Sequence, residues 1–171
     1  RSMSTLSVDT IQGKTTAGAV AMPSGHIIQT LSSTKLTAQG TQTGSYVDIS
    51  DLAVTITPKF STSKILITVH VYASYTDAGM LRILRDTTRI PNNTEGSTDN
   101  NRGYAMVRHE QGNEGNIYSF THLDAPSTTS ATTYKVQAQR NGGSGTMEIN
   151  RRYSNTDYSC CSSITVQEIS Q

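Results

Sequence analysis

The sequence predicts an all-β protein: an antiparallel, two-sheet β-sandwich of the jelly-roll type behind a short extended N-terminal segment. The first supporting observation is composition, because 21 Ser and 26 Thr residues form more than a quarter of the 171-residue chain. The second is pattern, since alternating apolar and polar runs recur between clusters of Gly, Pro, Asn and Asp. The third is size, because a sandwich of this length buries enough apolar surface to fold without disulfides.

Residues 1–25 differ in character from the rest of the chain. Arg1 and Ser2 resemble a cloning scar, which makes Met3 the expected native start. The stretch up to residue 25 is rich in Thr, Gly, Ala and Ser and has few apolar residues, so it cannot bury a core of its own. We therefore expect an N-terminal attachment or oligomerisation segment over residues 1–25 and a β-sandwich knob domain over residues 26–171.

Four strands are expected in the first half of the knob, at residues 26–36, 46–49, 53–57 and 64–74. Pro58 ends the third of them, because proline has no N–H to donate to a central ladder. The fourth has the strongest pattern, in which one face carries only apolar residues: Ile65, Ile67, Val69, Val71 and Ala73. This alternation predicts one dry face and one mixed face.

The middle of the chain alternates short strands with polar loops. Residues 80–85 and 89–90 are expected to pair as a hairpin, and residues 104–109 form the next strand. Residues 91–103 contain almost nothing apolar, and residues 111–115 form a second polar loop. A polar loop as long as residues 91–103 inside a compact domain is usually functional or mobile.

The last strands are expected at residues 116–123, 132–139, 146–153 and 162–169, which makes about nine or ten in all. Residues 141–145 (Asn-Gly-Gly-Ser-Gly) lie between the second and third of these. Their glycines supply positive φ angles, so we expect a hairpin that joins residues 132–139 to residues 146–153.

The charge balance excludes several classes of partner. Lys and Arg number 14 against 13 Asp and Glu, for a net charge of +1, and only 16% of residues are charged. Polynucleotides and anionic membranes both need an electrostatic excess, so neither is expected as a partner. No apolar run reaches the ~18 residues of a membrane span.

Metal and cofactor sites are not expected. The four histidines are scattered without the spacing of metal ligands, and Cys160-Cys161 is at most half of a metal site. Neighbouring residues on a strand point to opposite faces, so these cysteines are badly placed to bridge one another. We expect one packed thiol and one outward thiol, and assembly in a reducing cytoplasm.

No catalytic motif emerges, so no enzyme activity is expected. The chain has neither a nucleophile elbow nor a phosphate-binding loop followed by a helix. A glycosidase would need two carboxylates that converge in a cleft. The sequence suggests no such pairing among the candidates, which we expect to be solvated: Asp99, Glu110, Glu114, Asp124 and Glu148.

The chain resembles short virion proteins of tailed bacteriophages, especially marine and cyanobacterial ones, from Met3 to Ile169. The opening of the chain is typical of that group: Met3-Ser4-Thr5-Leu6-Ser7-Val8-Asp9-Thr10-Ile11-Gln12-Gly13. Six later stretches are also similar to it: Leu52-Ala53-Val54-Thr55-Ile56-Thr57-Pro58, Ser63-Lys64-Ile65-Leu66-Ile67, Leu84-Arg85-Asp86, Asp124-Ala125-Pro126, Ser130-Ala131-Thr132-Thr133-Tyr134-Lys135-Val136-Gln137 and Ser163-Ile164-Thr165-Val166-Gln167-Glu168-Ile169. These are structural positions, and none is catalytic.

The resemblance implies a non-enzymatic tail-fibre or tail-spike component of the virion, usually a homotrimer. Residues 3–25 would attach it to other tail or baseplate proteins. A knob akin to tumour-necrosis-factor-like jelly rolls would display loops that bind a host surface glycan or protein. The mixed strand face with His70 and Tyr72 would then be the subunit interface. The alternative is a purely structural virion protein, a capsid decoration or tail connector, without a receptor.

Within this reading, the two polar loops and their flanking tyrosines are the candidate receptor site. Weak sugar recognition needs paired hydrogen-bond donors and acceptors beside a flat apolar ring. The residues that offer this mixture are Asn100, Asn101, Arg102, Tyr104, Asn113 and Tyr118. The alternative is that the loops are only solvated connections, in which case residues 124–131 and 141–145 are the next candidates.

Overall fold

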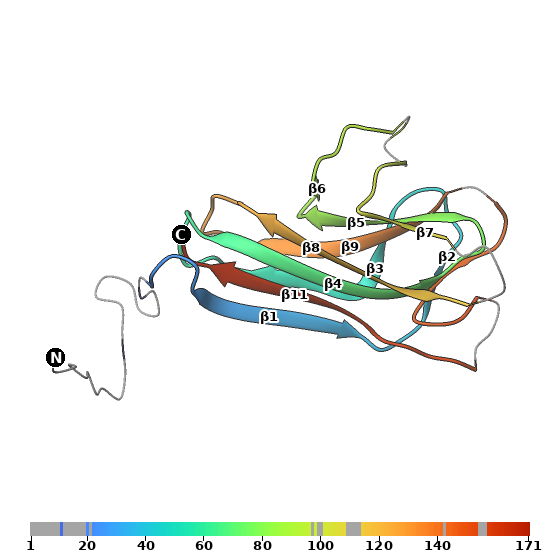
Figure 1. Cartoon of the computed structure of the whole chain (residues 1–171), viewed down its shortest axis with the longest axis horizontal. Helices are drawn as coiled ribbons and strands as arrows, with labels where there is room; N and C mark the ends of the chain where they lie inside the picture. Colours follow the sequence, from blue (N-terminus) through green and yellow to red (C-terminus); the bar gives the residue numbers. More distant parts are fainter. Residues whose placement is uncertain are drawn as a thin grey trace, which may run out of the picture.

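The computed structural model describes residues 11, 20, 22–96, 98, 101–108, 114–141, 143–153 and 157–171. In this part of the chain, the backbone forms two antiparallel β-sheets packed face to face, as Figure 1 shows, and no helix. The predicted all-β, two-sheet sandwich is therefore confirmed. Among the described residues, there is no helix that is long and apolar enough to cross a membrane.

The first sheet, here called the β4 sheet, has six strands. Its four long strands lie in the order β1 (Ile27–Lys35), β11 (Ser162–Ile169), β4 (Lys64–Ser74) and β8 (Asn116–Asp124). Two short strands, β10 (Met147–Ile149) and β2 (Gln39–Thr41), extend it beside the end of β4.

The second sheet, here called the β9 sheet, has five strands. Its order is β3 (Val47–Ile56), β9 (Thr132–Asn141) and β5 (Ala78–Arg85). Two short strands, β6 (Thr88–Ile90) and β7 (Ala105–Val107), both pair with the free edge of β5.

The core lies between the two sheets and confirms the predicted dry face. The five apolar residues of β4 from Ile65 to Ala73 are completely buried. They pack in one cluster with Leu81, Ile83 and Val136 of the β9 sheet. Burial of apolar surface of this kind is the main favourable term in folding.

The bounds of two predicted strands coincide with those observed, at residues 64–74 and 162–169. The two short strands expected at residues 46–49 and 53–57 are a single strand, β3. Its register with β9 shifts between Asp48 and Ala53, and Asp51 has a φ of 64° there. A bulge of this kind inserts residues without ending the strand, so the sequence pattern breaks while the pairing continues.

The hairpin predicted between residues 132–139 and 146–153 is wrong. The strand β9 pairs with β3 and β5, whereas β10 pairs with β2 and β4 in the other sheet. The glycine-rich connection therefore crosses between the sheets. Gly143 and Gly145 do have the expected positive φ, of 63° and 103°. Such glycines predict a sharp turn, but they do not determine which sheet the chain enters next.

Both ends of the knob lie at the same end of the sandwich (Figure 1). Ser170 links them, because its hydroxyl donates to the carbonyl of Met22 at 2.9 Å and its carbonyl accepts from the N–H of Gly25 at 2.8 Å. Most of the predicted N-terminal segment, residues 1–25, lies outside the described residues. The connections into and out of β10 lie at the opposite end, here called the distal end.

Candidate functional site

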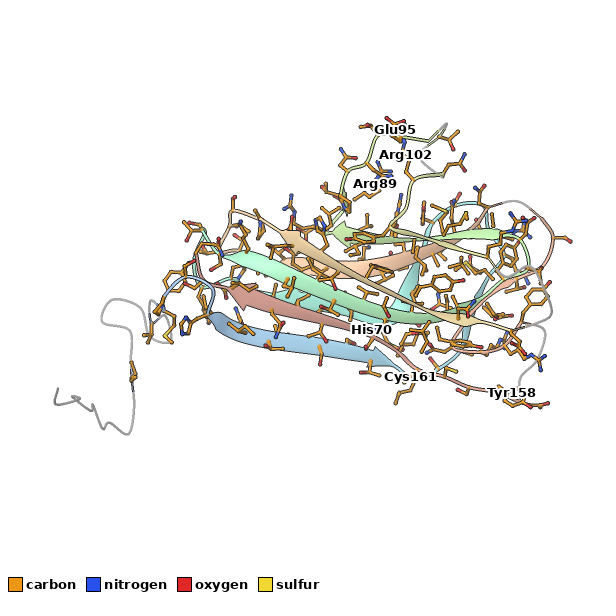
Figure 2. All side chains as sticks on the ribbon, in the orientation of Figure 1. His70, Arg89, Glu95, Arg102, Tyr158 and Cys161 are labelled. Atoms are coloured by element: carbon orange, nitrogen blue, oxygen red, sulfur yellow. The ribbon has the colours of Figure 1, made fainter. Side chains whose placement is uncertain are left out.

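The loop at residues 91–103 stands out from the edge of the β9 sheet between β6 and β7 (Figure 1). Two arginines, both labelled in Figure 2, donate hydrogen bonds to residues of this loop. Arg89 donates to the side chain of Asn92 and to the carbonyl of Asn93, at 2.9 Å each. Arg102 donates to the carbonyl of Gly96 at 3.1 Å. The described part of the loop is thus internally hydrogen-bonded.

The base of this loop is packed tightly on β5. The hydroxyl of Tyr46 donates to the carbonyl of Arg102 at 2.8 Å, and the N–H of Tyr104 donates to the carbonyl of Leu81 at 2.6 Å. A Cβ atom on Gly103 would lie 2.7 Å from the same Leu81 oxygen. Only glycine therefore lets the chain approach β5 this closely.

Tyr104 joins the two sheets. Its ring stacks on Phe120 of β8, with centroids 4.7 Å apart and an interplanar angle of 21°. Its hydroxyl donates to the carbonyl of Thr121. One ring face and the hydroxyl are therefore engaged within the protein, which leaves less of this side chain for a ligand than its place beside a polar loop predicts.

Of the six predicted receptor residues, Asn100 and Asn113 lie outside the described residues. Asn101 is exposed, and its side-chain oxygen accepts from the amide of Asn141 at 2.7 Å. Tyr118 is half-buried on β8, two residues before the stacking partner of Tyr104, and its hydroxyl lies 3.3 Å from the backbone nitrogen of Arg108. The structure thus places Asn101, Arg102 and Tyr104 together and Tyr118 farther along the joint between the sheets.

The predicted interface residues lie on the outer face of the β4 sheet. His70 is exposed, and its Nδ1 lies 2.8 Å from the hydroxyl of Ser119 on β8. Tyr72 is half-buried and pairs across the ladder with Ile117, whose side chain is 68% exposed. Leu123 on the same edge strand is also largely exposed. This face therefore combines polar groups with apolar residues that the single chain leaves uncovered.

A hollow of about 360 Å³ opens at the distal end of this face. Its lining comes from three separate segments of the chain: Tyr72, Glu114, Gly115, Arg152, Tyr158 and Cys160. Figure 2 shows Tyr158 at the end of the sandwich away from the chain termini. Glu114 and Gly115 belong to the predicted polar loop at residues 111–115, but Arg152 and Tyr158 were not expected at a site, because no local spacing predicts that these segments meet.

Both cysteine thiols are free and exposed, so the expectation of one packed thiol is wrong. The strand β11 begins only at Ser162, one residue after Cys161. The two cysteines precede the strand, and the alternation of faces on which the expectation relied does not apply to them.

Two of the candidate carboxylates are buried rather than solvated, which corrects the sequence-based expectation. Asp124 accepts two hydrogen bonds from Arg85, at 3.0 and 2.9 Å, and one from the hydroxyl of Tyr134 at 2.7 Å. Glu148 accepts from Arg151 at 2.7 and 2.8 Å. A buried carboxylate is stable only when it is paired in this way.

These contacts set the local pKa directions. Burial raises the pKa of Tyr134 far above its usual range, and the hydrogen bond to Asp124 raises it further. The hydrogen bond to Glu148 raises the pKa of Arg151. Both hydrogen-bonding groups therefore keep their protons at any physiological pH. Among the described residues, no cluster of three or more His, Cys, Asp and Glu side chains could hold a metal ion.

No protein-family model matches the chain, and no curated protein matches it. The class that can be stated is therefore structural: an antiparallel two-sheet β-sandwich with a projecting polar loop and a hollow at its distal end.

Proposed function

We propose that the chain is the knob of a bacteriophage tail fibre, a non-enzymatic virion protein that binds the host cell surface. The observation that carries this proposal is that the two ends of the domain differ. Both ends of the knob lie at one end, where residues 3–25 would attach to tail or baseplate proteins (Figure 1). The distal end then points away from the virion, and the 91–103 loop projects from the side of the domain (Figure 1). The resemblance of the sequence to short phage virion proteins supports the same role.

We further infer a jelly roll from the order of the eight main strands. Counted along the chain as β1, β3, β4, β5, β7, β8, β9 and β11, they lie in the order 1-8-3-6 in one sheet and 2-7-4-5 in the other. This order arises when one long antiparallel hairpin folds over on itself, which is the arrangement of a jelly roll. Jelly rolls are frequent in virion proteins.

The proposal includes a homotrimer assembled through the outer face of the β4 sheet, around His70 and Tyr72. Three exposed or half-exposed apolar side chains support this face as the interface: Leu66, Ile117 and Leu123. Apolar residues grouped on one side of a sheet are typical of a surface that a second subunit covers.

The substitution Ile117→Glu is expected to dissociate the trimer, because a carboxylate buried without a partner costs several kcal/mol. Light scattering at micromolar concentration should report the trimer for the wild type and a monomer for this variant. Met106→Glu is the matched control, since Met106 is a similarly exposed apolar residue on the β9 sheet. A monomeric wild-type protein, or a trimeric Ile117→Glu variant, would contradict the interface.

Host binding is tested with purified protein and with susceptible and resistant bacteria. We expect the protein to bind only to susceptible cells. If the 91–103 loop makes the contact, the double variant Asn101→Ala/Arg102→Ala should bind these cells at least about tenfold more weakly, a loss of ~1.4 kcal/mol in binding free energy. Tyr104 is left unchanged in this variant because its ring packs on Phe120. A folded trimer that binds neither strain would contradict the adhesin and favour the structural virion role.

A further inference from the structure

The distal hollow has the size and position of a ligand site. Its volume of about 360 Å³ lies near the lower end of the ~300–1,000 Å³ range of small-molecule sites. Its walls come from the end of β4, from the residues that lead into β8, and from the connection between β10 and β11. It faces away from the chain termini, where a proposed fibre knob would meet a host surface (Figures 1 and 2).

The side chains that line the hollow combine two kinds of group. Tyr72 and Tyr158 offer flat apolar rings with polar tips, and Tyr158 is 60% exposed. Arg152 supplies N–H donors beside the ring of Tyr158, with its guanidinium carbon 5.9 Å from the ring centroid. Glu114 is exposed and supplies acceptor oxygens. Rings beside a paired donor and acceptor are the groups that a polyhydroxylated ring needs.

The hollow is built by the folded backbone. A Cβ atom on Gly115 would lie 2.7 Å from the ring of Tyr72, so glycine is what allows this wall to close against the ring. On the other wall, the N–H of Cys160 donates to the carbonyl of Asn150 at 2.9 Å, and Arg151 pairs with Ser159 as an isolated bridge. Arg152 and Tyr158 flank that bridge and are thereby placed on the same wall.

We propose that this hollow binds one saccharide unit, with Tyr72 and Tyr158 against its ring and Arg152 and Glu114 on its hydroxyl groups. One cation and one anion leave the lining without net charge, which favours a neutral sugar over a phosphate or a nucleotide. The proposal deepens the adhesin function and rests on it for the source of the sugar, a host surface glycan. Three hollows on one trimer would raise weak single-site binding by avidity.

Saturation-transfer NMR with glucose, galactose, mannose and N-acetylglucosamine, at millimolar concentrations, tests the proposal on the purified full chain. At least one sugar should bind, and Tyr158→Ala and Arg152→Gln should each weaken its binding by about tenfold or more. Arg102→Gln, the same change in the 91–103 loop, should leave it unchanged. Binding of none of the four sugars, or unchanged binding in both hollow variants, would overturn the proposal. Binding of inorganic phosphate in preference to the sugars would also overturn it.

The two cysteines provide a second readout that locates the bound sugar. The Cys161→Ser variant leaves Cys160, which lines the hollow, as its single thiol, and the bound sugar should slow its alkylation by N-ethylmaleimide several-fold. The Cys160→Ser variant leaves only Cys161, whose alkylation rate should not change. Equal protection of both thiols, or protection of neither, would show that the sugar binds elsewhere.

Failure of this proposal and failure of the adhesin function give different results. If the protein binds susceptible cells but no sugar enters the hollow, the saccharide site is wrong and the adhesin stands. If a sugar protects Cys160 but the protein binds no cells, the saccharide site stands and the adhesin is wrong.

Discussion

Replacing Asn150 with alanine is expected to lower the free energy of unfolding by about 2–4 kcal/mol. Asn150 is completely buried where β10 gives way to the connection that leads to β11. Its amide donates to the carbonyls of Lys35 and Thr37, at 2.8 and 3.2 Å, and its side-chain oxygen accepts from the hydroxyl of Ser162. Alanine would leave the buried Lys35 carbonyl and Ser162 hydroxyl, and the more exposed Thr37 carbonyl, without these partners.

The backbone adds a second cost at the same position. Asn150 has a φ of 62°, a conformation that asparagine tolerates better than alanine because its side chain can hydrogen-bond locally. Asn150→Gly removes the hydrogen bonds but accepts this φ without strain. It should therefore be more stable than Asn150→Ala, by about 1 kcal/mol.

Urea unfolding at one fixed protein concentration measures these differences, since the stability of an oligomer depends on concentration. Asn92→Ala, in the exposed loop, serves as the control and should stay within about 0.5 kcal/mol of the wild type. An unchanged midpoint for Asn150→Ala would show that the hydrogen bonds of Asn150 are not needed.

Asp124→Ala is expected to destabilise the sandwich by a similar amount, about 2–4 kcal/mol. The carboxylate of Asp124 lies on β8 of the β4 sheet, and both of its partners, Arg85 and Tyr134, belong to the β9 sheet. Its removal leaves a completely buried phenol and a largely buried guanidinium without an acceptor. The cost comes mainly from those unpaired groups, because breaking a buried pair is worse than never forming it.

A double-mutant cycle separates these contributions. Tyr134→Phe alone should cost about 1–2 kcal/mol, since only one neutral donor is lost. In the background of Asp124→Ala, Tyr134→Phe should lower the free energy of unfolding by less, or even raise it, because phenylalanine removes the hydroxyl that has lost its acceptor. Strictly additive effects, measured by urea unfolding, would contradict a shared network across the sheets.

Asp48→Ala is the surface control for Asp124→Ala. Asp48 pairs with Lys135 at 2.8 Å, but its side chain is 53% exposed, so its loss should cost no more than about 1 kcal/mol. Burial raises the pKa of Asp48, but hydrogen bonds from Lys135 and Gln137 together with the positive charges of Lys135 and Arg82 lower it by more, so the net pKa is below its usual value. Its small contribution is therefore present above the unfolded-state pKa and is lost as the pH falls through the lower folded-state pKa.

Local pattern predicted those parts of the fold that depend on burial of one strand face. The alternation at residues 64–74 predicted β4 with correct bounds, because a central strand with one dry face needs an apolar residue at every second position. The pattern failed at β3, where the bulge at Asp51 changes the phase of the alternation without ending the strand. It also missed β2, whose three residues are too few to show a period.

The receptor site was predicted from loop composition, and composition does not report packing. The sequence predicted Tyr104 as a ring available to a ligand, but the packing of the two sheets places Phe120 of β8 against it. Likewise, the guanidinium of Arg102 donates to the carbonyl of Gly96 within the same loop, which loop composition does not predict. The contact between Tyr104 and Phe120 joins positions that no local spacing connects.

The sequence by itself determined the fold class and the face that β4 buries, because both follow from a period of two residues along the chain. The pairing of β9 and β10 with different sheets, the placement of Asp124 and Asn150, and the distal hollow were decided only by the tertiary structure. In the hollow, Tyr72 meets Arg152 and Tyr158 from a connection about eighty residues later in the chain. The physical reason is that such meetings depend on the pairing of whole strands, and a turn or a loop contains no residue that specifies its distant partner.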